Sequence, residues 1–112
     1  MIKGRFLKFK DVAGEYRFNL QSANNKIIMK GSEGYSSSAA CDKGIASVRV
    51  NSQIDQRYKK KTMSNGEYMF TLIAGNYEPI GVSEGYNTSA GRDEGINDVK
   101  RIAPDAPVAD QT

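Results

Sequence analysis

One short motif that occurs twice carries the side chains most suited to catalysis. The sequence Ser-Glu-Gly-Tyr at 32–35 recurs at 83–86. A serine nucleophile needs a neighbouring base, and the chain contains no histidine to supply one. Glu33 and Glu84 would suit glycoside hydrolysis if the fold held them roughly 5–10 Å apart. We favour a structural interpretation, in which each motif is a turn that bonds backbone groups before a helix. The residues of this motif are Ser32, Glu33, Tyr35, Ser83, Glu84 and Tyr86.

A run of basic side chains around one tyrosine is the second candidate site. Lysine and arginine neutralise phosphates, and an aromatic ring among them can stack on a base of single-stranded nucleic acid. Weak nucleic-acid binding is therefore one hypothesis. Lysines on an exposed edge strand also block aggregation between sheets, and we favour that explanation. The net charge of the chain is only +3. The candidate binding residues are Arg57, Tyr58, Lys59, Lys60, Lys61, Lys8 and Lys10.

The composition narrows the choice of function. The chain has 112 residues, of which 38% are hydrophobic and 26% charged, as in ordinary soluble globular proteins. The lack of histidine removes the commonest general base and metal ligand. A single cysteine, Cys41, excludes an intrachain disulfide and a cysteine cluster for zinc. We therefore predict no catalytic residue, no metal and no cofactor.

No segment of the chain predicts a membrane or secretory location. A membrane helix needs about 20 apolar residues, and no such run occurs. Residues 1–10 contain four basic side chains and no apolar core of a signal peptide. We therefore expect a cytoplasmic protein with no membrane partner.

An internal repeat dominates the sequence and predicts its organisation. Residues 14–20 recur 52 positions later as 66–72, and, after one deleted position, the 32–48 region matches 83–99. Repeat one therefore covers 4–52 and repeat two covers 56–103, and 1–103 is predicted to form a single pseudo-symmetric domain. Residues 104–112 contain two prolines and few apolar side chains, so we predict a disordered tail. Cys41 aligns with Arg92, which predicts that the cysteine is exposed.

Each copy shows the same order of expected elements. Tyr16, Phe18 and Leu20 alternate with polar residues, which predicts a strand with one buried face, as do their twins at 68, 70 and 72. Further strands are expected over 5–10 and 26–30. The counterpart of the third strand contains Pro79, which suggests an edge strand or one that begins late. Serines at 36–38 and Asn-Thr-Ser at 87–89 predict helix starts, and the alternation over 48–50 suggests a short closing strand.

These motifs resemble the YegP-like family of small bacterial proteins. The resemblance covers both copies and rests on the Gly-Glu-Tyr-Arg-Phe motif at 14–18, Ser32-Glu33, Tyr35 and Gly44-Ile45. It implies an α+β fold of β-β-β-α-β units that pair as dimers or tandem repeats and exchange C-terminal strands. It implies no activity. This chain departs from the family at 58–61, where three lysines replace more apolar residues.

The sequence therefore predicts a fold of two tandem β-β-β-α-β repeats related by a pseudo-twofold axis. We expect a monomer with one core shared between the repeats. We favour a non-enzymatic binding or structural module that acts through protein contacts or a small ligand between the repeats. Nucleic-acid binding through the basic first strands is the alternative, and an enzyme is not expected. The sequence names no partner.

Overall fold

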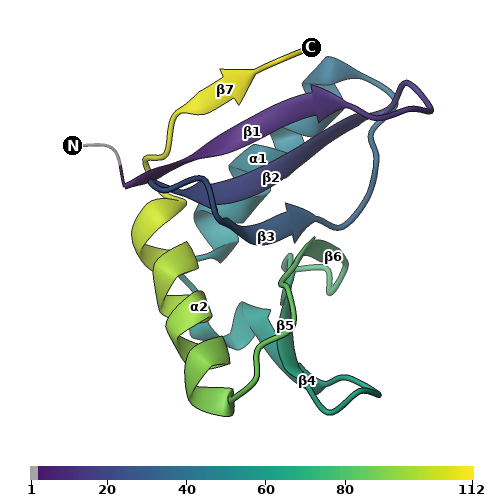
Figure 1. Ribbon diagram of the computed structural model, residues 1–112. Helices are drawn as coiled ribbons and strands as arrows, with labels where there is room; N and C mark the ends of the chain where they lie inside the picture. Colours follow the sequence, from purple (N-terminus) through teal and green to yellow (C-terminus); the bar gives the residue numbers. More distant parts are fainter. Residues whose placement is uncertain (1–2) are drawn as a thin grey trace.

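Two strand–strand–strand–helix units share one mixed sheet in this computed structural model, which describes residues 3–112 (Figure 1). The first unit consists of β1 Gly4–Lys10, β2 Tyr16–Ser22, β3 Ile27–Gly31 and α1 Ser38–Asn51. A 3-10 turn, η1 Asp55–Arg57, leads into the second unit. That unit consists of β4 Tyr58–Thr62, β5 Tyr68–Ile73, β6 Pro79–Val82 and α2 Ser89–Ile102. A short strand, β7 Val108–Asp110, follows α2.

The order of the strands reveals the pseudo-twofold symmetry. The sheet runs β4-β5-β6-β3-β2-β1-β7, so the two units meet where β3 and β6 pair antiparallel. The α+β fold and the tandem repeat are therefore confirmed. The strand with Pro79 is not an edge strand, because β6 lies at the centre of the sheet, and it does not begin late, because β3 begins at the twin position Ile27. Pro79 is its first residue, a position where the missing N–H is tolerated.

Both units contribute to one core. Phe18 and Phe70 are buried at twin positions, as the alternation predicts. The helix α1 packs on β2 and also reaches β5 and β6 of the other unit, and α2 reaches β2 and β3 in the same way. A single cluster of buried side chains contains residues of both copies, which ties the repeats together.

The two helices begin as the sequence predicts but continue further. Ser37 accepts a hydrogen bond from the Ala40 N–H, and Thr88 accepts one from the Gly91 N–H, so both caps lie within the predicted segments. The short closing strand expected over 48–50 is wrong, because these residues form the last turns of α1. Val48 is buried and Val50 is exposed, which is also compatible with one face of a helix.

The predicted disordered tail at 104–112 is also wrong. Its strand β7 pairs parallel with β1, and Figure 1 shows it along the outer side of β1. Ala106 is buried in the core cluster. The C-terminal segment of repeat two therefore completes the sheet beside the first strand of repeat one, which is the strand exchange that the family resemblance implies.

No helix within residues 3–112 is long and apolar enough to span a membrane.

Candidate binding site

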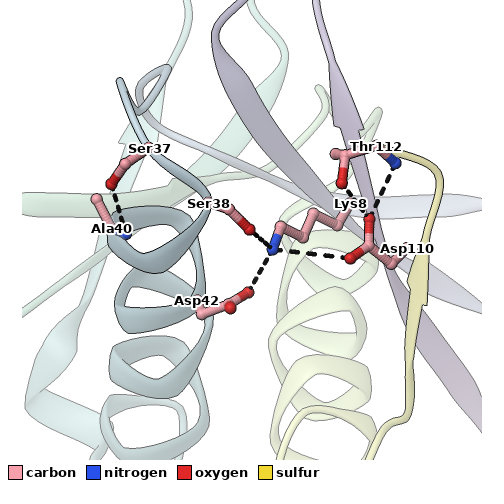
Figure 2. Close-up of polar contacts among 7 residues, drawn as sticks. All are labelled: Lys8, Ser37, Ser38, Ala40, Asp42, Asp110 and Thr112. Carbon is pink, nitrogen blue, oxygen red and sulfur yellow. Dashed lines mark hydrogen bonds and ion pairs between the residues drawn. The ribbon is translucent and has the colours of Figure 1, made fainter.

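Lys8 lies in the middle of β1, and its ammonium lies between α1 and β7 (Figure 2). Its side chain is only 3% exposed. The ammonium donates to Ser38 Oγ at 2.5 Å and to Asp42 Oδ1 at 2.8 Å, both on α1. Asp110 Oδ2 of β7 lies 3.9 Å away. The hydrogen bond to Asp42 outweighs the effect of burial and raises the pKa of Lys8, so the lysine stays charged.

The C-terminal segment closes over Lys8 by adding a strand to β1. Val108 lies opposite Phe6, and Asp110 lies opposite Lys8. The Phe6 N–H donates to the Pro107 carbonyl at 2.9 Å, and the Gln111 N–H donates to the Lys8 carbonyl at 2.8 Å. The segment therefore covers both the outer backbone groups of β1 and the side chain of its central lysine.

Arg49 of α1 anchors the start of this segment. One of its Nη atoms donates to the carbonyls of Ala103 and Pro104, at 3.1 and 3.3 Å. The guanidinium carbon lies 5.0 Å from the centre of the Phe6 ring, within cation–π range. The C-terminal segment therefore covers the outer edge of β1. Arg49 holds the start of the segment, Ala106 is buried in the core, and β7 pairs with β1.

The twin of β1 is β4, which ends the sheet without such a cover among residues 3–112. Hydrogen-bonded and unbonded residues alternate along an antiparallel pair. Beyond the end of β4, the Met63 N–H donates to the Glu67 carbonyl, so Lys61 and Lys59 also bond toward β5. The N–H and C=O of Lys60 therefore point to the open edge. These are the groups that β7 covers on the corresponding Lys8.

A groove of about 330 Å³ lies beside this open edge, between β4 and α2. We call it the β4 groove. It is lined by Asp55, Tyr58, Lys60, Asp93, Ile96, Asn97 and Lys100. Three of these residues, Tyr58, Lys60 and Lys100, are the twins of Phe6, Lys8 and Arg49, which hold the C-terminal segment in repeat one. The β4 groove is thus the open counterpart of the place that the segment fills.

The charges around the β4 groove repeat those around Lys8. Lys60 Nζ lies 3.0 Å from Asp93 Oδ1, and Asp93 is the twin of Asp42. The Lys60 side chain is 50% exposed, whereas that of Lys8 is 3% exposed. The hydrogen bond from Lys60 holds the pKa of Asp93 below its usual range. Lys100 pairs with Asp55, and its ammonium lies 5.7 Å from the centre of the Tyr58 ring.

The structure separates the basic residues proposed for nucleic-acid binding. Lys8 is enclosed, so its inclusion in a phosphate-binding surface is wrong. Tyr58 is buried, packs edge-on against Phe70 and donates its hydroxyl to the Ser52 carbonyl at 2.8 Å, so stacking on a base is wrong as well. Lys59 and Lys61 are exposed, Arg57 is half-buried, and Lys10 lies over the Tyr16 ring. The nucleic-acid hypothesis is therefore not supported.

The repeat contains a signal that predicts the burial of Lys8, namely a lysine and an aspartate kept as a pair in both copies. Both copies keep a lysine at this strand position, Lys8 and Lys60, and an aspartate on the helix, Asp42 and Asp93. Phe6 and Lys8 are two positions apart and share one face of a strand, so the burial of Phe6 predicts an inward lysine.

The two Ser-Glu-Gly-Tyr motifs lie where the sheet turns toward each helix. Ser32 donates to the Pro79 carbonyl at 2.6 Å, and Ser83 accepts from the Phe70 N–H at 2.9 Å. Glu33 is exposed, and Glu84 is exposed and paired with Lys30 at 3.6 Å. Each serine thus contacts backbone groups of the sheet.

The tyrosines of these motifs explain the glycines inside the helices. The backbone of Tyr35 pairs with that of Tyr16, and its ring stacks on Phe18. A Cβ atom at Gly44 would lie 2.4 Å from the Tyr35 hydroxyl. Tyr86 and Gly95 repeat this contact at 2.3 Å. Burial raises the pKa of both phenols. The glycines therefore make room for a ring.

The prediction that Cys41 is exposed is wrong, since the residue is 0% exposed. The alignment with Arg92 does not indicate exposure, because the arginine side chain is itself only 12% exposed. The guanidinium of Arg92 lies 5.5 Å from the centre of the Tyr68 ring and also pairs with Asp93. An arginine can fill an inward position in this way when its charged end finds partners.

A second hollow, of about 350 Å³, lies between the repeats, where a small ligand is expected from the sequence. Its walls combine the β2–β3 turn of repeat one with α2 of repeat two. The lining residues are Ser22, Asn24, Lys26, Ile28, Tyr86, Gly91, Glu94, Gly95 and Asp98.

The fold and the site together define a tandem-repeat α+β protein in which the first strand of repeat one pairs with β7, whereas its twin β4 is an edge strand. Comparison with known proteins places it more closely. The chain belongs to the family described as "Domain of unknown function (DUF1508)", whose model matches twice, over residues 11–58 and 64–110. The resemblance to YegP-like proteins is therefore confirmed.

Three relatives cover nearly the whole chain. The UPF0339 protein in the ptx operon 5' region of Stutzerimonas stutzeri is 41% identical, over 97% of each chain. The solution NMR structure of a protein of unknown function, YegP from Escherichia coli, is 40% identical, with a TM-score of 0.93 over 100% of this chain and 96% of that one. A UPF0339 protein from Shewanella oneidensis is 31% identical, with a TM-score of 0.90 over 97% of this chain and 92% of that one.

Proposed function

We propose that this protein is a non-enzymatic interaction module that binds an extended segment of another protein along β4. The observation that carries the proposal is the contrast between twin edges: β1 is covered by β7, and β4 is bare. Addition of a strand to an open sheet edge is a common mode of peptide recognition, because main-chain hydrogen bonds supply affinity and neighbouring pockets supply specificity. We further propose that the module acts as a monomer in the cytoplasm.

The residues with catalytic potential support binding over catalysis. Ser32 and Ser83 contact backbone groups, and the sole thiol, Cys41, is enclosed in the core, where burial raises its pKa and keeps it protonated. The exposed lysines of β4 protect the free edge against random pairing, as the sequence suggested. The same lysines leave the edge open to a segment of opposite, negative charge.

Site-specific photocrosslinking in living cells tests this proposal. A photoreactive phenylalanine analogue placed at Lys59, on β4, should give a discrete adduct with a partner protein. The matched control places the same analogue at the exposed Lys43 of α1, away from the sheet edge, and should give none. A blocking variant, Lys60→Pro, removes the outward N–H without breaking a bond to β5 and should abolish the adduct.

Two results would refute the interaction module. One is the absence of any β4-dependent adduct. The other is an adduct that persists unchanged in the Lys60→Pro variant, since contact would then not use the sheet edge. Circular dichroism of the purified variant checks that the fold is retained.

A further inference from the structure

We infer that the segment bound by β4 runs parallel to it and places a carboxylate against Lys60, after one or more small apolar residues. This inference rests on the proposed function and specifies the chemistry of the partner. The model for the occupant is the chain's own segment 106–110, Ala-Pro-Val-Ala-Asp, on the twin strand β1.

The symmetry of the repeats fixes where each part of the occupant lies. On β1, Val108 lies opposite Phe6, Ala109 opposite Leu7 and Asp110 opposite Lys8. The twin positions on β4 are Tyr58, Lys59 and Lys60. An apolar side chain therefore belongs opposite Tyr58, a small one opposite Lys59, and an aspartate opposite Lys60.

The backbone groups of β4 suit this arrangement, with one difference from β1. The Tyr58 N–H is bonded to the Asp55 carbonyl of η1, whereas the Phe6 N–H binds the C-terminal segment. The occupant of β4 therefore starts its hydrogen bonds one group later, at the Tyr58 carbonyl. The N–H and C=O of Lys60 then supply the next donor and acceptor.

The electrostatics of the β4 groove favour an acidic occupant. Lys8 shows that this lysine position accommodates two carboxylates, Asp42 on the helix and Asp110 on the added strand. Lys60 already contacts Asp93 and is half exposed, so the place of the second carboxylate is open. Lys59 and Lys61 add positive charge on the other face of the strand.

The side wall of the β4 groove favours small residues before the carboxylate. In repeat one, Ala106 is buried two residues before β7, and Arg49 binds the carbonyls of Ala103 and Pro104. Lys100 is the twin of Arg49 and lies over Tyr58 in the same manner. It can donate to the carbonyls of an incoming chain while it pairs with Asp55.

A second copy of this chain is a poorer occupant than a different protein. Its own segment with this chemistry, 106–110, already covers its own β1. Moving that segment to a neighbour's β4 covers one edge and exposes another, so no net pairing is gained. The transfer also gives up the high effective concentration of an intramolecular contact. The occupant is therefore a segment of a partner protein.

The test uses the full chain and a synthetic peptide of residues 104–112, with blocked termini, as the probe. Titration of the isotope-labelled protein should shift the backbone NMR signals of β4 and of α2 around Ile96, and leave β1 and β7 unchanged. A peptide with asparagine in place of the aspartate at 110 should bind at least several-fold more weakly. Lys60→Glu should weaken binding at least tenfold, and a peptide with lysine at 110 should restore it.

Lys61→Glu is the matched control, because it makes the same change in charge one residue away, on the opposite face of β4. It should weaken binding clearly less than Lys60→Glu. Equal losses in the two variants would overturn the inference, as would shifts confined to β1 and β7, or no shift at millimolar peptide. If β4-dependent crosslinks form while the peptide fails to bind, the interaction module stands and the chemistry inferred for its partner is wrong.

Discussion

The twin lysines Lys8 and Lys60 offer an internal measure of what β7 contributes. Replacing either with alanine removes three methylene groups and an ammonium. For Lys8, whose side chain is 3% exposed, the stem is fully buried. At about 0.8 kcal/mol per buried methylene, with about 1 kcal/mol for the lost hydrogen bonds, we expect Lys8→Ala to cost about 3 kcal/mol. Lys60→Ala should cost about 1 kcal/mol, because its stem is half exposed and its ion pair with Asp93 is accessible to solvent.

Urea denaturation followed by circular dichroism measures this difference directly. Thermal unfolding gives a second measure. Because 1 kcal/mol corresponds to roughly 4 °C for a domain of this size, the melting temperatures of the two variants should differ by about 8 °C. Lys8→Met keeps most of the stem and should recover much of the loss. Equal losses at both positions would refute the claim that β7 is what distinguishes the two edges.

Three further predictions follow from single contacts. Gly44→Ala should destabilise the fold by about 1–3 kcal/mol despite the better helix propensity of alanine, since its Cβ would lie 2.4 Å from the Tyr35 hydroxyl. In chemical denaturation, adding Tyr35→Phe should recover part of that loss. A Gly44→Ala variant more stable than the wild type would contradict the contact. Arg17 Nε lies 2.6 Å from Asp11, and this hydrogen bond holds the pKa of Asp11 below its ordinary 3.8. The stabilisation from Asp11 should therefore be present above about pH 5 and be lost as the pH falls through its folded pKa. Asp11→Asn should lower stability at pH 7, and the gap to the wild type should narrow as the pH falls below 3.8; a gap that does not narrow in acid would argue against the pair. Cys41 should resist a water-soluble thiol reagent in the native protein and react after denaturation, and prompt native labelling would show that the thiol is exposed.

The repeat made most of the fold predictable from sequence. Two aligned copies with alternating Tyr, Phe and Leu positions define the strands and the inward faces, and the serine-rich starts define the helix caps. The family resemblance supplied the exchange of terminal strands. The symmetry of the repeat does not predict the structure at positions where the two copies differ.

The errors lie at those differences. The segment that forms β7 is short and rich in proline and small residues, so its order comes from the partner strand β1 and from Arg49, neither of which is close in sequence. Cys41 was assigned to the surface because its twin is an arginine, yet Arg92 finds an aromatic ring and an aspartate inside the fold. The twin pairs Lys8–Asp42 and Lys60–Asp93 were readable as ion pairs, but only the structure reveals which of the two is covered.

Hydrogen exchange at the Lys60 amide tests the central claim most directly, because that N–H is assigned to the open edge of β4. In the free protein it should exchange close to the unprotected rate, while the Lys8 amide beneath β7 is strongly protected. Saturation with the 104–112 peptide should slow exchange at Lys60 at least tenfold and leave Lys8 unchanged. A Lys60 amide as protected as that of Lys8 in the free protein, or one that the peptide does not slow, would contradict the account.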